Sequence, residues 1–139
     1  MLRKILVPVD FTPKNERALD AARELATAAG GEITLVHVVE TLEDELDGDL
    51  REFYARLEQR AAERMAESLA KLGKGTFGRR SAIVLGHRAR AVIDYAQKEG
   101  IELIVLSSHR VDPDHPGADW MTISYRIAIL ARCPVMLVK

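Results

Sequence analysis

Polar side chains that could do chemistry follow short apolar runs of the chain. Asp10 comes directly after residues 5–9, where its carboxylate could contact a ribose or a metal, or could close a turn by accepting backbone N–H bonds. Ser107, Ser108, His109 and Arg110 follow residues 103–106. Their hydroxyls, backbone N–H groups and guanidinium could hold a phosphate, or could form a polar surface loop.

Other reactive residue types fit structural roles better. The candidate metal ligands between 109 and 119 have no regular spacing and share their segment with two prolines, which favours a solvated loop; they are His109, Asp112, Asp114, His115 and Asp119. His37 lies inside an apolar run and is expected to be a hydrogen-bonded core or edge histidine. Cys133, next to Pro134, is expected to be a small packing residue.

Three well-known catalytic and phosphate-binding patterns are absent from the sequence. It contains no GxxxxGK[ST], no GxGxxG after its first apolar run, and no GxSxG. These absences argue against a P-loop NTPase, a dinucleotide enzyme of the usual kind and a serine hydrolase. No group of residues forms a convincing catalytic constellation, so we expect a binding or regulatory module and not an enzyme.

The elements that must position these residues alternate along the chain. Continuous apolar runs typical of strands buried on both faces occur at 5–9, 33–39, 82–85, 103–106 and 135–138. Helical patterns lie between them. Thr12 is the predicted N-cap of the first helix, and Asp49 with Glu52 resembles a capping box at the start of the second. Alternation of this kind predicts an α/β fold with a parallel sheet and helices on both faces.

Composition bounds the class of protein. The chain has 139 residues, 47% of them hydrophobic and 29% charged, which fits one globular domain. Its formal net charge of −1 argues against binding to nucleic acid or to an anionic membrane surface, because both need a basic surplus. No stretch is apolar enough to span a membrane or to serve as a signal peptide, and a single cysteine suits a reducing compartment, so a cytoplasmic location is expected.

Five segments together resemble the universal stress protein family of the UspA type, over residues 1–139. The opening Lys4–Thr12 and the segment Leu35–Val39 are similar to the family's first two strands. Residues 86–93 resemble its G-x-P-x-x-x-I segment. Residues 102–110 resemble DLIVMGSHR, and residues 131–138 resemble APCPVLVV.

The resemblance implies a single open sheet of five parallel strands in the order 3-2-1-4-5, a Rossmann-like fold similar to the adenine nucleotide alpha hydrolases. It also implies a homodimer, which we expect through the last strand, residues Val135, Met136, Leu137 and Val138. That strand lies at a predicted sheet edge, where unpaired backbone groups invite pairing with a second copy.

Many members of the family bind AMP or ATP, and ATP brings magnesium. By resemblance, Asp10 would approach the ribose and Val39 the adenine. The full set of expected nucleotide-binding residues is Pro8, Val9, Asp10, Val38, Val39, Gly86, Arg88, Ser107, Ser108, His109, Arg110 and Thr122. For Arg88, an exposed role in solubility is the alternative.

The family's phosphate motif, G-x2-G-x9-G-[ST], is eroded in this chain. Ser107, Arg110 and Met121 stand at the glycine positions, and Thr122 takes the Ser/Thr place after a connection one residue longer than the pattern. Side chains there restrict the backbone that would cradle phosphates, although Arg110 could supply a positive contact. The sequence therefore predicts a stress-response regulatory module with a degenerate adenine-nucleotide site. The alternative is a member without nucleotide binding that acts only through contacts with an unknown protein partner.

Overall fold

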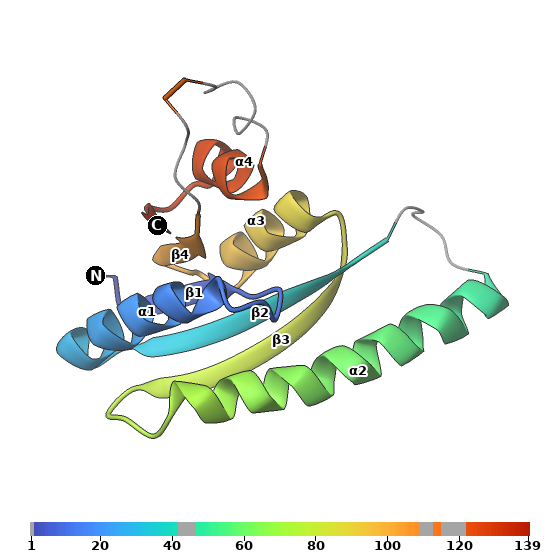
Figure 1. The fold of residues 1–139 in the computed structure, drawn as a ribbon, viewed down its shortest axis with the longest axis horizontal. Helices are drawn as coiled ribbons and strands as arrows, with labels where there is room; N and C mark the ends of the chain where they lie inside the picture. The colour runs from blue at the N-terminus through green and yellow to red at the C-terminus, as the bar shows by residue number, and fades with distance from the viewer. Residues whose placement is uncertain (1, 42–46, 109–112, 115–121) are drawn as a thin grey trace.

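The computed structural model describes residues 2–41, 47–108, 113–114 and 122–139. Strands and helices alternate along them as the sequence predicts (Figure 1). The elements are β1 (Lys4–Pro8), α1 (Asn15–Ala29), β2 (Glu32–Glu40), α2 (Gly48–Leu72), β3 (Gly78–Gly86), α3 (Arg88–Lys98), β4 (Leu103–Ser107), α4 (Ile123–Leu130) and β5 (Val135–Val138).

The strands form one parallel sheet in the order β3-β2-β1-β4-β5, which confirms the predicted fold class. Chain order reverses at β1, which pairs with β2 on one side and with β4 on the other. In open sheets of this kind, ligands bind beyond the carboxyl ends of the strands at such a reversal. The topology therefore places any ligand site beyond Pro8 and Ser107.

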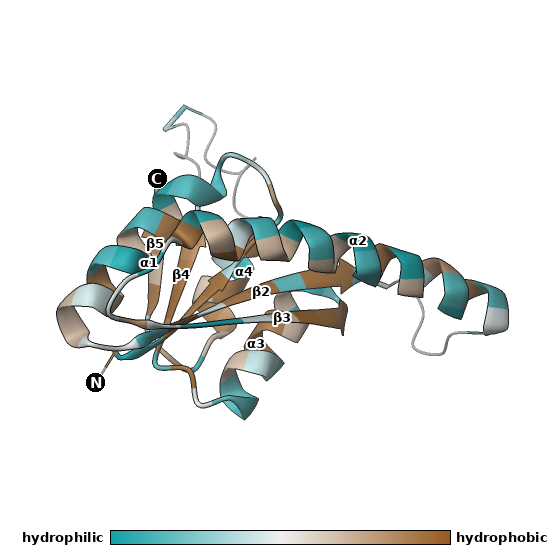
Figure 2. Ribbon diagram, turned by 90° about the horizontal axis from the view of Figure 1, so that it is seen from below, coloured by the Kyte–Doolittle hydropathy of each residue, from teal (hydrophilic) through white to brown (hydrophobic). Residues whose placement is uncertain are grey.

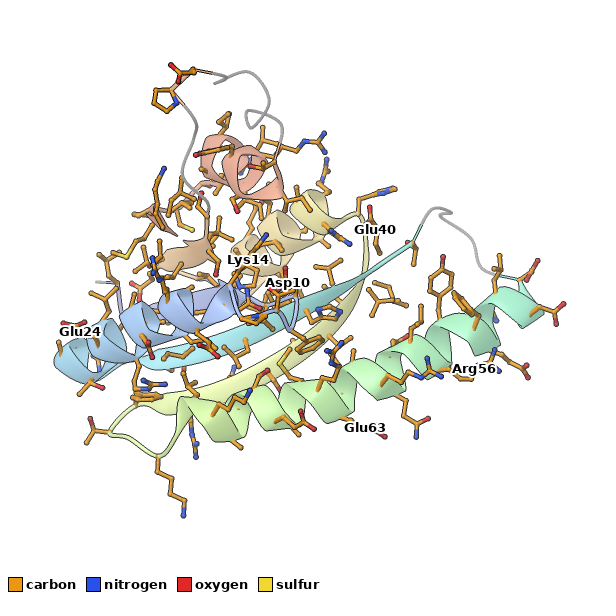
Figure 3. The ribbon with its side chains drawn as sticks, in the orientation of Figure 1. Asp10, Lys14, Glu24, Glu40, Arg56 and Glu63 are labelled. Atoms are coloured by element: carbon orange, nitrogen blue, oxygen red, sulfur yellow. The ribbon has the colours of Figure 1, made fainter. Side chains whose placement is uncertain are left out.

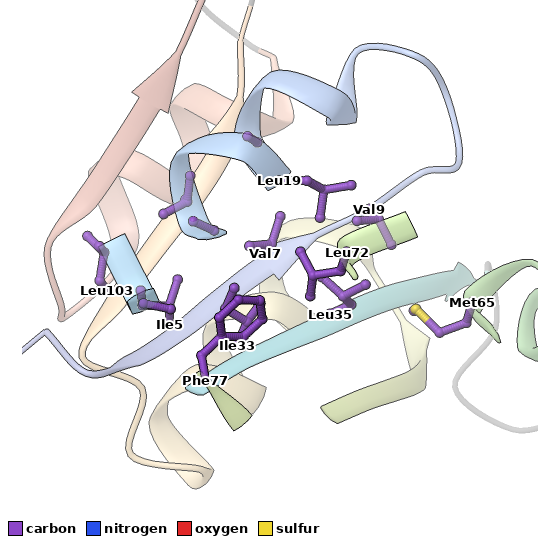
Figure 4. Packing of buried hydrophobic residues seen from close by; sticks show 14 residues of the cluster. Ile5, Val7, Val9, Leu19, Ile33, Leu35, Met65, Leu72, Phe77 and Leu103 are labelled. Carbon is purple, nitrogen blue, oxygen red and sulfur yellow. The ribbon is translucent and has the colours of Figure 1, made fainter. Parts of the chain in front are cut away.

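Alternating side chains of the central strands fill two separate cores. Ile5 and Val7 of β1 are fully buried with residues of α1 and α2 on one face, as Figure 4 shows. Leu6 is fully buried on the other face with residues of α3 and α4. The apolar strands seen in Figure 2 are thus covered on both faces. Packing on both faces holds the ends of the strands in fixed relative positions.

The predicted starts of the first two helices are wrong. α1 begins at Asn15, and its N-cap is Lys14 without a side-chain bond. Thr12 lies in a turn before the helix, where its hydroxyl donates to Asp10 Oδ1 at 2.6 Å and its carbonyl accepts the Asn15 N–H. The N-cap of α2 is Asp47, whose carboxylate accepts a bond from the Leu50 N–H at 3.0 Å. The chain therefore uses a carboxylate that lies two residues before the predicted capping box.

β3 is longer than the predicted strand 82–85. Its first residues, Gly78–Ser81, are exposed at the edge of the sheet, so they pair with β2 without the apolar pattern of a central strand. α2 runs along this part of the sheet and extends beyond the strands (Figure 2). Ala61, Met65 and Leu72 bury its second half, which fixes the rotation of the helix about its own axis.

Candidate functional site

A cavity of about 800 Å³ lies at the carboxyl ends of the strands. Its walls come from the β1–α1 connection, the ends of β2 and β4, one side of α2, and the starts of α3 and α4. This is the reversal point that the topology indicates. The volume falls within the usual range for small-molecule sites.

Most of the sequence-predicted site residues meet at this cavity. It is lined by Pro8, Val9, Asp10, Val38, Val39, Arg88, Ser107, Ser108 and Thr122. Gly86 is not part of the lining. Its φ of +149° and its carbonyl, which accepts the Thr41 N–H at 3.1 Å, give it a backbone role where the chain leaves β3. His109 and Arg110 lie outside the described residues.

Asp10 closes a local turn and also faces the cavity. Its Oδ1 accepts bonds from the Thr12 N–H at 3.0 Å and from the Thr12 hydroxyl. The side chain is exposed, and Oδ2 makes no hydrogen bond within the described part of the chain. One carboxylate oxygen thus fixes the turn, which confirms the turn interpretation of Asp10. The other oxygen faces the cavity, and its contact with a ligand stays a prediction.

Asn15 is a site residue that the sequence analysis missed. It is only 7% exposed. Its Oδ1 accepts the Asp10 N–H at 2.9 Å, and its Nδ2 lies 3.5 Å from Ser107 Oγ. The side chain therefore ties the β1–α1 connection to the end of β4. An Asn five residues after Asp10 is too common a pattern to be recognised without the fold.

Residues at the ends of β4 and α4 have much of their bonding capacity occupied. The Ser108 N–H donates to the Val138 carbonyl at 2.8 Å, and the Ser107 carbonyl accepts the Ser124 hydroxyl at 2.8 Å. Thr122 is the N-cap of α4, with its Oγ1 3.5 Å from the Tyr125 N–H. These groups are bonded within the fold. The Ser108 N–H is therefore not free to donate to a phosphate.

Phe11, His37 and Arg64 form a stack on the α2 side of the cavity. His37 donates from Nδ1 to the Val9 carbonyl at 2.8 Å, which confirms the expectation of a hydrogen-bonded histidine. The Phe11 ring lies 4.4 Å from the His37 ring, and the Arg64 guanidinium lies 5.1 Å from the centre of the Phe11 ring. Phe11 adopts φ +64°, a left-handed conformation that costs energy in a residue with a side chain.

The charges of the cavity lining favour an anion. Arg88 Nε pairs with Glu40 Oε2 at 2.9 Å. Figure 3 shows Glu40 at the end of β2, and Asp10 with Lys14 at the β1–α1 connection. The lining holds four cationic side chains and two carboxylates, namely Lys14, Arg60, Arg64 and Arg88 with Asp10 and Glu40.

Two of the remaining reactive candidates, Asp114 and Cys133, are among the described residues, and neither lines this cavity. Of the proposed metal ligands, Asp114 is described, and the others between 109 and 119 lie outside the described residues. Among the residues that the structure describes, no group of three metal-ligating side chains is found. Cys133 lies in a separate small pocket, where burial raises the pKa of its thiol.

Comparison with known proteins agrees with the fold and with the sequence resemblance. The model of the universal stress protein family matches residues 1–139. Universal stress protein YxiE of Bacillus subtilis is 25% identical, and the match covers 100% of both chains. Universal stress protein A homolog 1 of Coxiella burnetii is 28% identical over 98% of this chain and 95% of its own.

Solved structures have the same fold. Universal stress protein UspA from Lactobacillus plantarum superposes with a TM-score of 0.80 at 20% identity, over 100% of this chain and 99% of that one. A universal stress protein from Archaeoglobus fulgidus, solved in complex with dAMP, gives 0.68 at 20% identity over the whole of both chains. A third universal stress protein, solved in complex with cAMP, gives a TM-score of 0.61 at 17% identity over 97% of this chain and 94% of that one.

Within the described residues, no helix has the length and apolar character needed to cross a bilayer.

Proposed function

Since the chain belongs to the universal stress protein family, we propose that it is a small regulatory protein of stress responses that binds an adenine nucleotide in the cavity at the carboxyl ends of its strands. The cavity itself is the observation that carries this proposal. It opens at the strand reversal, and it joins an apolar wall to a carboxylate and several cations. The apolar wall suits a flat aromatic base, the carboxylate suits the hydroxyls of a ribose, and the cations suit a phosphate anion.

The adenosine half of the ligand fits the part of the cavity formed by β1 and β2. Val38 and Val39 at the end of β2 offer apolar contact to a base, and Asp10 offers the unbonded Oδ2 to a ribose hydroxyl. Relatives with this fold have been solved with dAMP and with cAMP. These two ligands share adenine on a pentose and differ in their sugar hydroxyls and in the phosphate, which supports a site centred on the base and its sugar.

The phosphate half is weakened on the side of the β4–α4 connection. The Ser108 N–H and the Ser107 carbonyl are bonded within the fold, and Thr122 caps α4. Ser107 Oγ lies 3.5 Å from Asn15 Nδ2, and within the described residues no histidine bonds to it. We therefore propose binding without catalysis, with a degenerate phosphate site on this side, and we expect magnesium to add little affinity.

Calorimetric titration of adenosine, AMP and ATP, with and without magnesium, tests the proposal. Wild-type protein should bind all three ligands. Asp10→Asn keeps an oxygen that can accept the Thr12 bonds while it removes the charge, and it should weaken adenosine about tenfold. Asp20→Asn, on α1 outside the cavity lining, is the matched control. If wild type binds none of the three, the alternative holds, and the protein acts through protein contacts alone.

A homodimer through β5 is the second part of the proposal. β5 pairs only with β4 in the described sheet, so its other edge is open. The carbonyls of Pro134 and Val138 accept bonds from the N–H groups of Ile104 in β4 and of Ser108, which directly follows β4. Residues that alternate with them, Val135 and Leu137, therefore direct their N–H and C=O groups outward, where a second copy could pair with them.

Apolar side chains beside this edge support the same interface. Ile129 and Leu130 at the end of α4 are 76% and 61% exposed, and Met136 of β5 is 37% exposed. Exposed large apolar residues that gather in one patch are typical of surfaces where proteins associate. A two-fold axis perpendicular to β5 at this edge would pair the strand antiparallel with its copy, and the exposed apolar side chains would be covered by the same interface.

A further inference from the structure

Two arginines of α2 reach the cavity from the side away from the eroded glycine motif. Arg60 and Arg64 line the cavity one helical turn apart, and both are exposed. We propose that they, and not the connection between β4 and α4, hold the anionic end of the ligand. This inference rests on the proposed nucleotide site and names the residues that read the ligand's phosphate chain.

The charges of these two arginines are not balanced by a neighbouring carboxylate in the described part of the chain. Within residues 2–41, 47–108, 113–114 and 122–139, neither forms an ion pair. Glu63 and Glu67 lie three residues further along α2, a spacing at which helix ion pairs form readily. Glu63 instead lies on the side of α2 turned away from the sheet (Figure 3). Two like charges four residues apart repel, and an anion in the cavity would relieve that repulsion.

Arg64 is also held in position before a ligand arrives. Its guanidinium lies 5.1 Å from the centre of the Phe11 ring. That ring lies on His37, which is anchored by its bond to the Val9 carbonyl. A guanidinium on an aromatic face keeps its N–H groups free at the edge of its plane, so it can still donate to phosphate oxygens. Preorganisation of this kind lowers the entropy that binding must overcome.

The charge balance on this side of the cavity favours a phosphate chain over a single small anion. Arg88 is neutralised by Glu40, and Asp10 faces the ribose position with one oxygen already bonded to Thr12. Lys14 has no ion pair in the described part of the chain and adds a third charge to the two arginines. The affinity gained from this side should therefore increase from adenosine to AMP to ATP.

The test is titration of adenosine, AMP and ATP into wild type and into the double variant Arg60→Gln/Arg64→Gln. ATP should bind the double variant at least about tenfold more weakly, AMP should lose less affinity, and adenosine should be unchanged. The ATP loss should shrink when the salt concentration is raised, because exposed charges are screened. Arg64→Lys in place of Arg64→Gln keeps the charge without the fork of donors. ATP affinity should then be higher than in the double variant and lower than in wild type.

Two further variants locate the effect. Arg56→Gln removes a charge from the same helix outside the cavity lining and is the matched control. Arg110→Gln removes the cation of the eroded motif. Arg56→Gln should change ATP affinity by less than about twofold, and Arg110→Gln should lower it by less than the α2 double variant does. Unchanged thermal unfolding of each variant shows that the fold is kept.

Three outcomes would overturn the inference. If ATP affinity fell with Arg110→Gln and not with the α2 double variant, the phosphates would bind at the connection between β4 and α4. An equal loss for adenosine and ATP would mean that the double variant damages the cavity as a whole. If wild type bound none of the three ligands, the proposed function would fail together with the inference, whereas the first two outcomes leave nucleotide binding intact.

Discussion

Phe11 stores backbone strain at the rim of the cavity, and its substitution reveals that strain. Its φ of +64° is a left-handed backbone conformation that crowds a Cβ atom. Glycine has no Cβ and adopts this conformation without penalty. In most positions, replacing alanine by glycine destabilises a protein. At residue 11 we expect the opposite order, with Phe11→Gly more stable than Phe11→Ala.

The magnitude follows from the contacts of the ring. Loss of the pair with His37 costs about 0.5–1.5 kcal/mol, and loss of the Arg64 contact costs about 0.5–1 kcal/mol. Phe11→Ala should therefore lower the free energy of unfolding by about 2 kcal/mol. Phe11→Gly recovers about 1–2 kcal/mol of strain but gives up about 0.4–1 kcal/mol to the entropy of the unfolded chain. The glycine variant should thus be more stable than the alanine variant by about 1 kcal/mol.

Urea unfolding of wild type and both variants measures this difference. With a slope of about 2 kcal/mol per M, the midpoints of the two variants should differ by about 0.5 M. Glu24 is exposed in α1 and serves as the control, since Glu24→Gly should be about 1 kcal/mol less stable than Glu24→Ala. If the alanine variant at residue 11 equals or exceeds the glycine variant, Phe11 carries no strain in solution and the argument from its φ is wrong.

Four more outcomes are expected. Asn15→Ala should lower the free energy of unfolding by about 1–3 kcal/mol because the Asp10 N–H loses its acceptor; Asn15→Asp keeps an oxygen there and should cost less in the same urea titration. Backbone N–H bonds, chiefly from Lys4, lower the pKa of Glu102 from its ordinary 4.5. Its carboxylate therefore stabilises the fold above pH 4.5, and the deficit of Glu102→Gln in urea titrations at a series of pH values should shrink as pH falls through the lowered pKa; a deficit independent of pH would contradict this. Burial raises the pKa of the Cys133 thiol, so a bulky thiol reagent should label the native protein far more slowly than the unfolded chain. Leu137→Pro removes an outward N–H from β5 and should turn a sedimenting dimer into a monomer, while wild type already monomeric at micromolar concentration would refute the interface.

The fold could be predicted because its strands are central and apolar. β1, β2 and β4 are covered on both faces, so their sequences are continuous apolar runs that no other element explains as well. The first half of β3 escaped prediction because an edge strand pairs by its backbone and needs no apolar side chains. The two helix starts were misplaced because several residues near each start could cap it, and only the fold decides which one does.

The site could be predicted only where it follows strand ends. Asp10, Val39, Ser107 and Ser108 line the cavity because parallel strands end at one edge of the sheet, a consequence of topology alone. The nucleotide that these residues would bind, and a cytoplasmic location, stay predictions. Residues from elsewhere in the chain could not be placed, and Asn15 is the example on α1.

The α2 arginines show why this limit is physical. The four-residue spacing shows that Arg60 and Arg64 lie on the same face of a helix, but it does not show whether that face is directed toward the cavity. Burial of Ala61 and Met65 against the sheet fixes the rotation of α2 about its own axis. The arginines beside these two residues then reach the cavity. The same packing brings Arg64 over the Phe11 ring, whose strained backbone persists only while its neighbours hold it. A change at Phe11 should therefore loosen Arg64, so ATP affinity and the free energy of unfolding should fall together in Phe11→Ala, with adenosine affinity less affected than ATP affinity.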